Sequence, residues 1–160
     1  MSLKEYKKKR DFKKTQEPGE TKTKTKSEGL IYVIQEHDAS HLHFDLRLEE
    51  DGVLKSWAVP KSPPQEEGIR RLAVETEDHP LGYEDFEGII PKGEYGAGKV
   101  KIWDRGDYIP LETTVLKRII DINGKKMRGR YCLIKLKPKD PKDRNWLFFR
   151  LKKINGKDEK

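Results

Sequence analysis

This 160-residue sequence is poor in cysteine and lacks any long apolar run, and each deficiency excludes a class of protein. Cys132 is the only cysteine, so no disulfide can form within the chain and paired-cysteine zinc motifs are absent. No apolar stretch approaches the roughly 20 residues that span a bilayer. The basic N-terminus is not followed by the apolar segment of a secretory signal. We therefore expect no membrane segment and a cytoplasmic location, a compartment that suits an unpaired cysteine.

Hydrophobic residues are also scarce, at 33%, whereas charged residues make up 39%. A chain of this length fits one domain with a densely charged surface. The net charge of +7 is uneven, because residues 1–28 hold ten Lys/Arg and five Asp/Glu, and residues 29–160 hold 25 and 23. The sequence predicts a basic, partly disordered and flexible arm over 1–28 and a single domain over 29–160. Such an arm is either a polyanion-binding segment or a solvated leader.

Short runs of β-branched and aromatic residues dominate after residue 29. Apolar residues alternate or cluster over 30–36, 42–48, 53–59, 72–76, 100–102, 115–122, 131–136 and 146–151. Turn signals separate several of them, including Glu50-Asp51-Gly52 and Asn123-Gly124. A helical turn is expected only within the arm. The pattern predicts a mostly β protein, an antiparallel barrel or sandwich with short helical elements.

Three of the four histidines lie within seven positions of one another, in the segment before and within the predicted strand 42–48. Strand alternation sends Phe44, Leu46 and Leu48 to the core, and it puts His43, Asp45 and Arg47 together on the other face. Imidazole and carboxylate are ligands for Mn, Fe or Zn, and an adjacent guanidinium can hold a phosphate. Alternation leaves the third ligand open between His37 and His41. A half-exposed strand with incidental histidines is the alternative.

The remaining motifs are weaker. His79 precedes Pro80, which favours an extended backbone, and it could be a general acid, a ligand, a phosphate contact or a surface histidine. The glycine-rich segment 88–99 lacks P-loop spacing, so its glycines are better explained by positive-φ turns. Trp57 and Trp103 are expected in the core or at its edge. No serine-hydrolase motif is present.

Five separated blocks resemble one known family, the 3′-phosphoesterase domain of bacterial DNA ligase D and its stand-alone relatives. They span residues 37–47, 54–61, 77–81, 86–88 and 95–98, and parts of the arm also fit. The resemblance implies a compact β-barrel and an Mn²⁺-dependent enzyme, with Zn²⁺ or Co²⁺ as alternative ions. It implies a 3′-phosphodiesterase and 3′-phosphomonoesterase that removes a terminal ribonucleoside and then the 3′-phosphate, leaving a 3′-hydroxyl for repair.

The resemblance also implies roles for individual residues. It selects His37, His43 and Asp45 as metal ligands, and it leaves His41 as a structural residue or one that supports a ligand without touching the metal. It assigns the scissile phosphate to Arg47 and His79, and catalysis to Tyr83. Further basic positions match residues that bind substrate phosphate: Lys61, Arg71 and Arg10. Four more positions match supporting residues: Asp11, Glu17, Gln35 and Glu77.

The implied substrates are nucleic-acid 3′ ends, preferably a primer–template with a terminal ribonucleotide. The chain is expected to be a monomer that cooperates with a DNA ligase or polymerase. Two other functions compete. His43, Asp45 and His79 have the outline of a non-haem iron oxygenase triad, but that function gives Lys61 and Arg71 no role. The other is a non-catalytic nucleic-acid-binding barrel in which the histidines are incidental.

Overall fold

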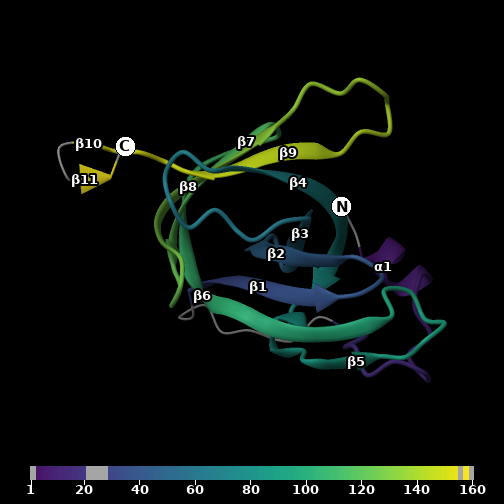
Figure 1. The fold of residues 1–160 in the computed structure, drawn as a ribbon. Helices are drawn as coiled ribbons and strands as arrows, with labels where there is room; N and C mark the ends of the chain where they lie inside the picture. The colour runs from purple at the N-terminus through teal and green to yellow at the C-terminus, as the bar shows by residue number, and fades with distance from the viewer. Residues whose placement is uncertain (1–2, 21–28, 155–156, 159–160) are drawn as a thin grey trace.

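Eight strands close into an antiparallel barrel in the computed structural model, which describes residues 3–20, 29–154 and 157–158 (Figure 1). The ring runs β1-β2-β3-β4-β9-β8-β7-β6 and closes where β6 pairs with β1. β5 pairs with the start of β6 outside the ring, and β10 and β11 form a separate small hairpin. The strands are β1 Leu30–Asp38, β2 Leu42–Glu50, β3 Val53–Val59, β4 Arg70–Pro80, β5 Gly88–Ile90, β6 Gly98–Thr114, β7 Lys117–Asn123, β8 Arg128–Lys135, β9 Asn145–Arg150, β10 Lys153–Ile154 and β11 Lys157–Asp158. The predicted β-barrel is confirmed.

The barrel interior is a single apolar cluster to which all eight ring strands contribute. Phe44, Leu46 and Leu48 of β2 belong to this cluster, and so does the fully buried Trp57 of β3. Trp103 packs at the edge of the cluster, as predicted. Because successive strand residues point to opposite faces, the intervening β2 residues lie on the outer face of the barrel. The predicted alternation of β2 is therefore confirmed, and the polar row faces away from the core.

Two of the tight turns match their sequence signals. Asp51 and Gly52 between β2 and β3 have φ values of 49° and 80°, which a two-residue hairpin loop with a right-handed strand twist requires. The turn after Asn123 is closed by a hydrogen bond from the Gly124 amide to the Met127 carbonyl oxygen, 2.9 Å long. The carboxylate of Asp104 accepts hydrogen bonds from the amides of this same turn.

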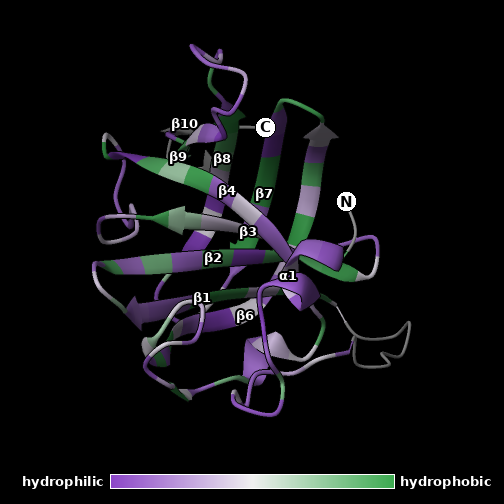
Figure 2. Cartoon of the chain, turned by 90° about the vertical axis from the view of Figure 1, so that its right-hand side faces the viewer, coloured by the Kyte–Doolittle hydropathy of each residue, from purple (hydrophilic) through white to green (hydrophobic). Residues whose placement is uncertain are grey.

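A second, smaller apolar cluster lies outside the barrel and includes Tyr6 from the N-terminal arm. The arm contributes α1, Lys4–Lys8, whose Tyr6 is fully buried, and the loop after β4 contributes the short 3₁₀ helix η1, Tyr83–Asp85. Figure 2 shows α1 beside the end of β4, which it contacts. No helix in the described part of the chain is long and apolar enough to cross a membrane.

The structure differs from the expectations at several points. The arm was expected to be flexible, but over residues 3–20 it packs on the barrel because Tyr6, Thr15 and Glu17 are buried there. Residues 1–2 and 21–28, where disorder was also expected, lie outside the described residues. The strand expected over 115–122 begins at Lys117, because Val115 and Leu116 form an exposed hairpin tip. The hairpin of β10 and β11 was not expected.

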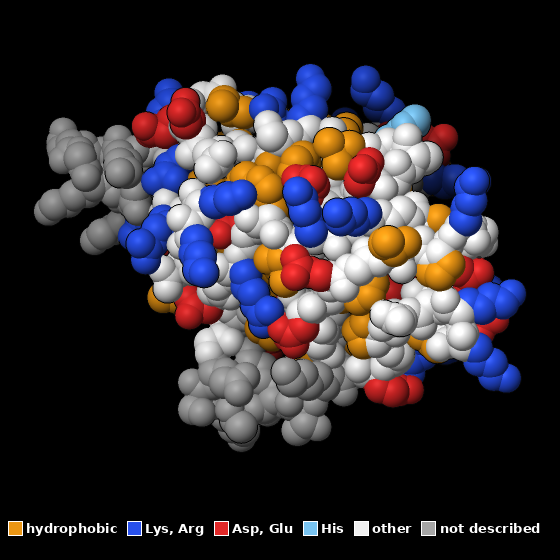
Figure 3. All heavy atoms as spheres, turned by 60° about the horizontal axis from the view of Figure 1, so that its bottom comes forward, with side chains coloured by type: hydrophobic (Ala, Val, Ile, Leu, Met, Phe, Trp, Pro, Cys, Tyr) orange, Lys and Arg blue, Asp and Glu red, His pale blue; other side chains and the backbone are white. Residues whose placement is uncertain are grey.

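Charge on the surface is mixed. On the face shown in Figure 3, Lys and Arg side chains are interspersed with Asp and Glu and with apolar atoms. Two of the ion pairs around β6 join Lys101 to Glu36 at 3.5 Å and Arg105 to Asp85 at 2.6 Å. On this face, the excess positive charge of the chain therefore does not by itself mark a binding surface, and we locate the site from its side-chain geometry.

Candidate metal and phosphate site

The antiparallel pairing of β1 and β2 brings two histidines side by side. His37 of β1 pairs directly with His43 of β2, and their ring centroids lie 4.7 Å apart. Asp45, two residues along β2 on the same outer face, completes the group. Its Oδ2 lies 3.5 Å from His37 Nδ1, and its Oδ1 lies 3.3 Å from His43 Nε2. Three ligand atoms, one from each of these residues, all lie within 4.8 Å of one another.

Each ring uses one nitrogen for a backbone carbonyl oxygen and directs its other nitrogen toward Asp45. His37 Nε2 donates to the Gly96 carbonyl oxygen at 2.6 Å, and His43 Nδ1 donates to the His41 carbonyl oxygen at 3.0 Å. A carbonyl oxygen only accepts, so each bonded nitrogen carries a proton, and the opposite nitrogen is the one that would bind a metal ion in place of its contact with Asp45. Carbonyl support of this kind orients metal-binding histidines. Two imidazoles and a carboxylate oriented in this way fit a divalent transition-metal ion.

Strand alternation left open whether His37 or His41 is the third ligand, and the geometry distinguishes between them. His41 lies in the three-residue connection between β1 and β2, is exposed, and directs Nδ1 to the neighbouring Ser40 carbonyl oxygen at 3.0 Å. His37 lies within β1 and belongs to the ligand group. The third donor of the group is therefore His37. His79, the third member of the oxygenase outline, is not part of this group.

The buried carboxylate of Asp45 remains ionised. Burial alone would raise its pKa, but the hydrogen bonds from His37 and His43 and the charge of Arg47 lower the pKa far below its ordinary value. For His43, burial lowers the pKa, but the hydrogen bond and the charge of Asp45 outweigh it, and the net shift is upward. The site therefore presents a permanent negative charge next to two nitrogen donors.

Arg47 lies beside Asp45 and is held by a fixed set of partners. Its Nε donates to Gln35 Oε1 at 2.7 Å, its Nη1 donates to Ser56 Oγ at 2.9 Å, and its Nη2 lies 3.5 Å from Asp45 Oδ2. The guanidinium also stacks over the Tyr83 ring, 4.7 Å from its centroid. Gln35 in turn donates to the backbone carbonyl oxygens of Tyr83 and, in the loop that follows η1, Phe86. A buried cation with so many partners is a rigid source of positive charge at the site.

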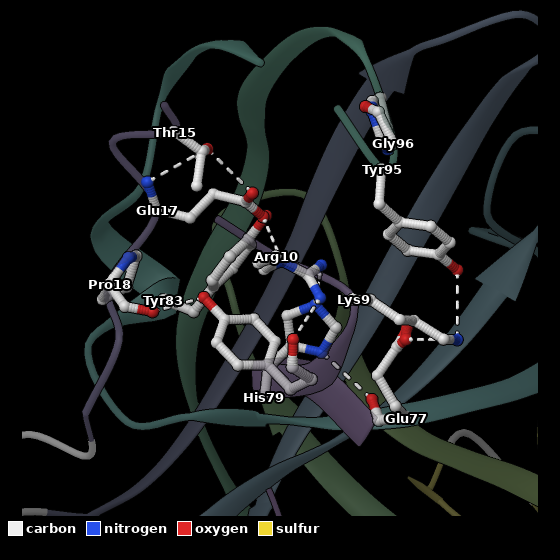
Figure 4. A network of polar contacts seen from close by, with 12 residues as sticks. Lys9, Arg10, Thr15, Glu17, Pro18, Glu77, His79, Tyr83, Tyr95 and Gly96 are labelled. Carbon is white, nitrogen blue, oxygen red and sulfur yellow. Dashed lines mark hydrogen bonds and ion pairs between the residues drawn. The ribbon is translucent and has the colours of Figure 1, made fainter. Parts of the chain in front are cut away.

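The N-terminal arm supplies a second buried cation (Figure 4). Arg10 Nε donates to Glu17 Oε2 at 2.9 Å, and both side chains are almost fully buried. The same Glu17 oxygen accepts a hydrogen bond of 2.5 Å from the Tyr83 hydroxyl, and Thr15 donates to the other oxygen. Burial, followed by the charge of Glu17, raises the pKa of Tyr83 well above its ordinary value, although Arg47 and Arg10 oppose this. The Tyr83 proton is thus present and is donated to Glu17.

His79 lies between the two arginines and is uncharged. Its Nδ1 donates to the Glu77 carbonyl oxygen at 3.0 Å, and its Nε2 lies 3.4 Å from Arg10 Nη2, which can only donate. Burial lowers the pKa of His79 well below its ordinary value, and the charges of Arg47 and Arg10 lower it further. Because Nε2 carries no proton in this arrangement, the geometry favours His79 as an acceptor and a positioning contact over a general acid.

These groups surround one cavity of about 260 Å³. It brings together eight of the residues expected in the site: Arg10, His37, His43, Asp45, Arg47, Glu77, His79 and Tyr83. Gln35 and Glu17 lie directly behind it as hydrogen-bond partners. Asp11 is exposed and closes a turn through the Lys13 amide, 3.1 Å from its Oδ1. Lys61 and Arg71 line a separate cavity of about 290 Å³ with Arg70.

Sequence reasoning from residue types missed several contributors. Tyr6 contacts the edge of the His79 ring at a centroid distance of 4.8 Å, and Lys9 pairs with Glu77 at 3.1 Å. Ser56 holds Arg47, and Tyr95 lines the cavity. The signal for Tyr95 was its place in the glycine-rich block 95–98, which resembles the family. Ser56 lies in the block 54–61, and Tyr6 and Lys9 lie in parts of the arm that also fit the family, but their residue types alone assigned them no role in the site.

Comparison with known proteins supports the same family. The model of a family described as "DNA Ligase D 3'-phosphoesterase domain" matches residues 35–135. The chain is 52% identical over 141 residues to a multifunctional non-homologous end joining protein LigD of Pseudomonas aeruginosa, which covers 83% of the chain and 16% of that protein. It is 48% identical over 162 residues to the corresponding DNA repair protein of Mycobacterium tuberculosis, which covers 99% of the chain and 20% of that protein. The chain thus spans at most a fifth of the length of these relatives.

Proposed function

The chain belongs to the DNA ligase D 3′-phosphoesterase domain family, and from this premise we propose that it is a metal-dependent hydrolase that heals the 3′ ends of nucleic-acid strands. It removes a 3′-terminal ribonucleoside and then the exposed 3′-phosphate, leaving a 3′-hydroxyl. The observation that carries the proposal is the ligand group of His37, His43 and Asp45 beside the buried Arg47 in one cavity. A transition-metal donor set next to a fixed guanidinium suits a phosphoryl group.

We propose Mn²⁺ as the ion, held by His37, His43 and Asp45, with Zn²⁺ and Co²⁺ as alternatives. The orientation of the two rings toward Asp45 and the ionised carboxylate support this assignment. When bound, such an ion polarises a phosphoryl oxygen and offsets the negative charge of the transition state. Gly96 and the His41 backbone keep the two rings in the ligating orientation through their carbonyl oxygens.

The residues of the chain itself supply the rest of the electrostatic environment. Arg47, held by Gln35 and Ser56, presents fixed positive charge to the phosphoryl oxygens, and electrostatic stabilisation by preorganised donors of this kind is commonly the largest catalytic effect. Arg10 and His79 line the same cavity. Tyr83 orients the phosphoryl group or water, and its proton becomes available to either one when the hydrogen bond to Glu17 opens.

Lys61 and Arg71 are proposed to bind phosphate oxygens during phosphate removal. Their cavity is the next along the sheet, since Lys61 follows β3 three residues after Ala58, which lines the main cavity. Arg71 is braced by a hydrogen bond of 2.7 Å from its Nε to the Ser62 carbonyl oxygen. Two basic side chains at this position suit the phosphates of a strand that enters the main cavity.

The proposed substrate is a primer–template with a ribonucleotide at the 3′ end, since a ribose 2′-hydroxyl is the group that separates RNA from DNA at a site. The relatives are named as non-homologous end joining proteins, which supports a role in end repair beside a DNA ligase or polymerase. We further propose that the chain acts as a monomer in the cytoplasm.

The test is incubation of such a primer–template with and without Mn²⁺, with product lengths and end groups followed on a sequencing gel. With Mn²⁺, we expect a shortened strand that ends in a 3′-phosphate, followed by a strand that ends in a 3′-hydroxyl. Without Mn²⁺, we expect neither product. Binding without turnover would instead support a non-catalytic barrel. A parallel incubation with Fe²⁺ and 2-oxoglutarate tests the oxygenase function, which predicts succinate.

A further inference from the structure

Tyr95 is the exposed aromatic residue at the rim of the proposed catalytic cavity. It lines the cavity with the metal-ligand group, yet 46% of its surface remains exposed. The other tyrosine of the lining, Tyr83, is only 2% exposed and is committed to Glu17 and Arg47. Tyr95 therefore has surface available for a ligand at the edge of a cavity that is lined by charged groups.

The ring is held in place from its own loop. The loop that carries it is closed by hydrogen bonds from the Glu94 amide to the Pro91 carbonyl oxygen and from the Ala97 amide to the Glu94 carbonyl oxygen, both 3.1 Å. The next residue, Gly96, has a φ of 76° and accepts the hydrogen bond from His37. The backbone position of Tyr95 is therefore tied directly to one of the three ligand residues.

The ring is also held from the arm, as Figure 4 shows. Lys9 Nζ lies 4.7 Å from the centroid of the Tyr95 ring and 3.4 Å from its hydroxyl oxygen. The guanidinium carbon of Arg10 lies 5.3 Å from the same centroid. Both cations come from adjacent positions of one short segment, and cation–π contacts orient an aromatic ring without covering it fully.

The chemistry of the proposed substrate gives this ring a role. A 3′-end phosphoester consists of a charged phosphoryl group attached to a nucleoside. The interior of the cavity offers imidazole, carboxylate and guanidinium groups to the phosphoryl group. The nucleoside must then lie toward the mouth, where Tyr95 is. Aromatic side chains that stack on bases tolerate any sequence, because every base has a π-face.

We propose that Tyr95 stacks on the terminal nucleobase and so makes the site specific for nucleotide ends over other phosphoesters. The proposal rests on the proposed 3′-end function and adds a specificity residue to it. Tyr95 touches the leaving or remaining nucleoside and takes no part in proton transfer. Its loss therefore weakens substrate binding and leaves the chemical step intact.

The test pairs a protein change with a substrate change. Hydrolysis of a 3′-phosphate is measured with Mn²⁺ for two oligonucleotides that differ only in whether the terminal nucleotide carries a base or a stable abasic sugar. Tyr95→Ala is compared with Tyr95→Phe, which keeps the ring and loses the hydroxyl contact to Lys9. Lys9→Ala is the matched control for a role in which Tyr95 only holds the arm through Lys9. Circular dichroism checks the fold of each variant.

For Tyr95→Ala, we expect KM on the base-bearing end to rise by roughly 5- to 100-fold, the range given by loss of one base–aromatic stack. The kcat should stay within about twofold. Removing the base should raise KM of the unaltered protein by a similar factor, and it should change KM of Tyr95→Ala little, because both changes remove the same contact. Tyr95→Phe should behave as the unaltered protein.

Equal losses on both oligonucleotides, or a Tyr95→Phe defect as large as that of Tyr95→Ala, would overturn the stacking proposal in favour of a bracing role through Lys9. If the unaltered protein hydrolyses neither end, the proposed function fails. The stacking proposal is then still decided by fluorescence anisotropy of the same two oligonucleotides without metal. A base-dependent affinity that Tyr95→Ala removes supports it, and a base-independent affinity refutes it.

Discussion

His37 and Gly96 are joined by a hydrogen bond of 2.6 Å between the imidazole Nε2 and the backbone carbonyl oxygen. This contact directs Nδ1 toward Asp45 and links the ligand group to the loop that carries Tyr95. A Cβ at position 96 would meet His37 Cε1 at 3.4 Å on a backbone with a φ of 76°, so glycine suits this position. The orientation of the first ligand is thus set by a segment about 60 residues away.

His37→Ala should abolish Mn²⁺-dependent hydrolysis. Because loss of even an outer partner of a ligand costs about 10- to 100-fold in metal affinity, loss of the ligand itself should cost at least about 100-fold. The measurement is Mn²⁺ titration followed by electron paramagnetic resonance, together with the rate of phosphate release. His41→Ala is the matched control, since His41 is exposed and outside the ligand group. Equal effects of the two substitutions would contradict the assignment of His37.

Gln35→Ala should reduce both stability and kcat. The change leaves Arg47 Nε and the carbonyl oxygens of Tyr83 and Phe86 without the partner they share in a buried position. A buried polar group left unsatisfied costs roughly 1–3 kcal/mol, and a mobile Arg47 provides less preorganised charge. Urea unfolding and steady-state kinetics measure the two effects. Gln65→Ala, at an exposed position, should change neither. Normal kcat in Gln35→Ala would show that Arg47 does not need this brace.

Acid should weaken the fold through Asp104. Burial raises the pKa of this carboxyl, but hydrogen bonds from the amides of Lys126, Met127 and Lys125 and from the Tyr32 hydroxyl give a net lowering. A carboxyl with a lowered pKa in the folded state stabilises the protein above its unfolded pKa, near 3.9, and this contribution is lost as pH falls through the folded value.

Asp104→Asn should therefore lower the free energy of unfolding at pH 7 by about 1.5–3 kcal/mol, the range for hydrogen bonds to a charged group. The difference from the unaltered protein should shrink below about pH 4. Urea unfolding at pH 7, 5 and 3 measures it. Asp107→Asn, on the same strand but exposed, is the control. A difference that stays constant down to pH 3 would rule out the charge as its source.

Lys61→Ala should weaken binding of a 3′-phosphate oligonucleotide in a salt-dependent manner. If Lys61 contacts one phosphate of the strand, its loss should reduce the slope of log affinity against log salt by about 0.7–0.9. Anisotropy titrations at several salt concentrations measure the slope, with Lys137→Ala, exposed before β9, as the control. An unchanged slope would show that the Lys61 cavity is not part of the strand path.

The local part of the fold was predictable from the sequence because strand alternation depends on neighbouring residues only. The bounds of β3 match the strand predicted over 53–59, and the alternation of Phe44, Leu46 and Leu48 gives the interior face of β2. The apolar residues Val115 and Leu116 misled the assignment of β7, because they form an exposed tip. An apolar pair at a hairpin tip has the amino-acid composition of a strand, but its side chains are exposed.

The site was only partly predictable because its remaining contacts are not local. Alternation could not exclude His41, since it lies in the connection 39–41, where alternation no longer applies. The contact between Lys9 and Tyr95 joins residues 86 positions apart, and that between Glu17 and Tyr83 joins residues 66 apart. No periodicity in the sequence encodes such pairs, so the arm could be recognised as basic but not as a wall of the site.

Glu17→Gln should release the arm from the barrel. The change removes the charge partner of the buried Arg10, and loss of one partner of a buried ion pair is strongly destabilising, by about 3–5 kcal/mol. Docking of one short segment can be lost locally without global unfolding. We expect faster tryptic cleavage after Arg10, measured by mass spectrometry, together with lower activity.

Glu20→Gln provides the matched control within the same arm, because Glu20 is 83% exposed and pairs with the half-exposed Lys7. It should leave both cleavage and activity unchanged. If Glu17→Gln releases the arm but keeps full activity, the wall formed by Arg10 is dispensable for hydrolysis. If it keeps the arm protected but lowers activity, Glu17 acts on the reaction through the Tyr83 hydroxyl, to which it is joined by the 2.5 Å hydrogen bond. The two readouts thus separate docking of the arm from control of the tyrosine proton.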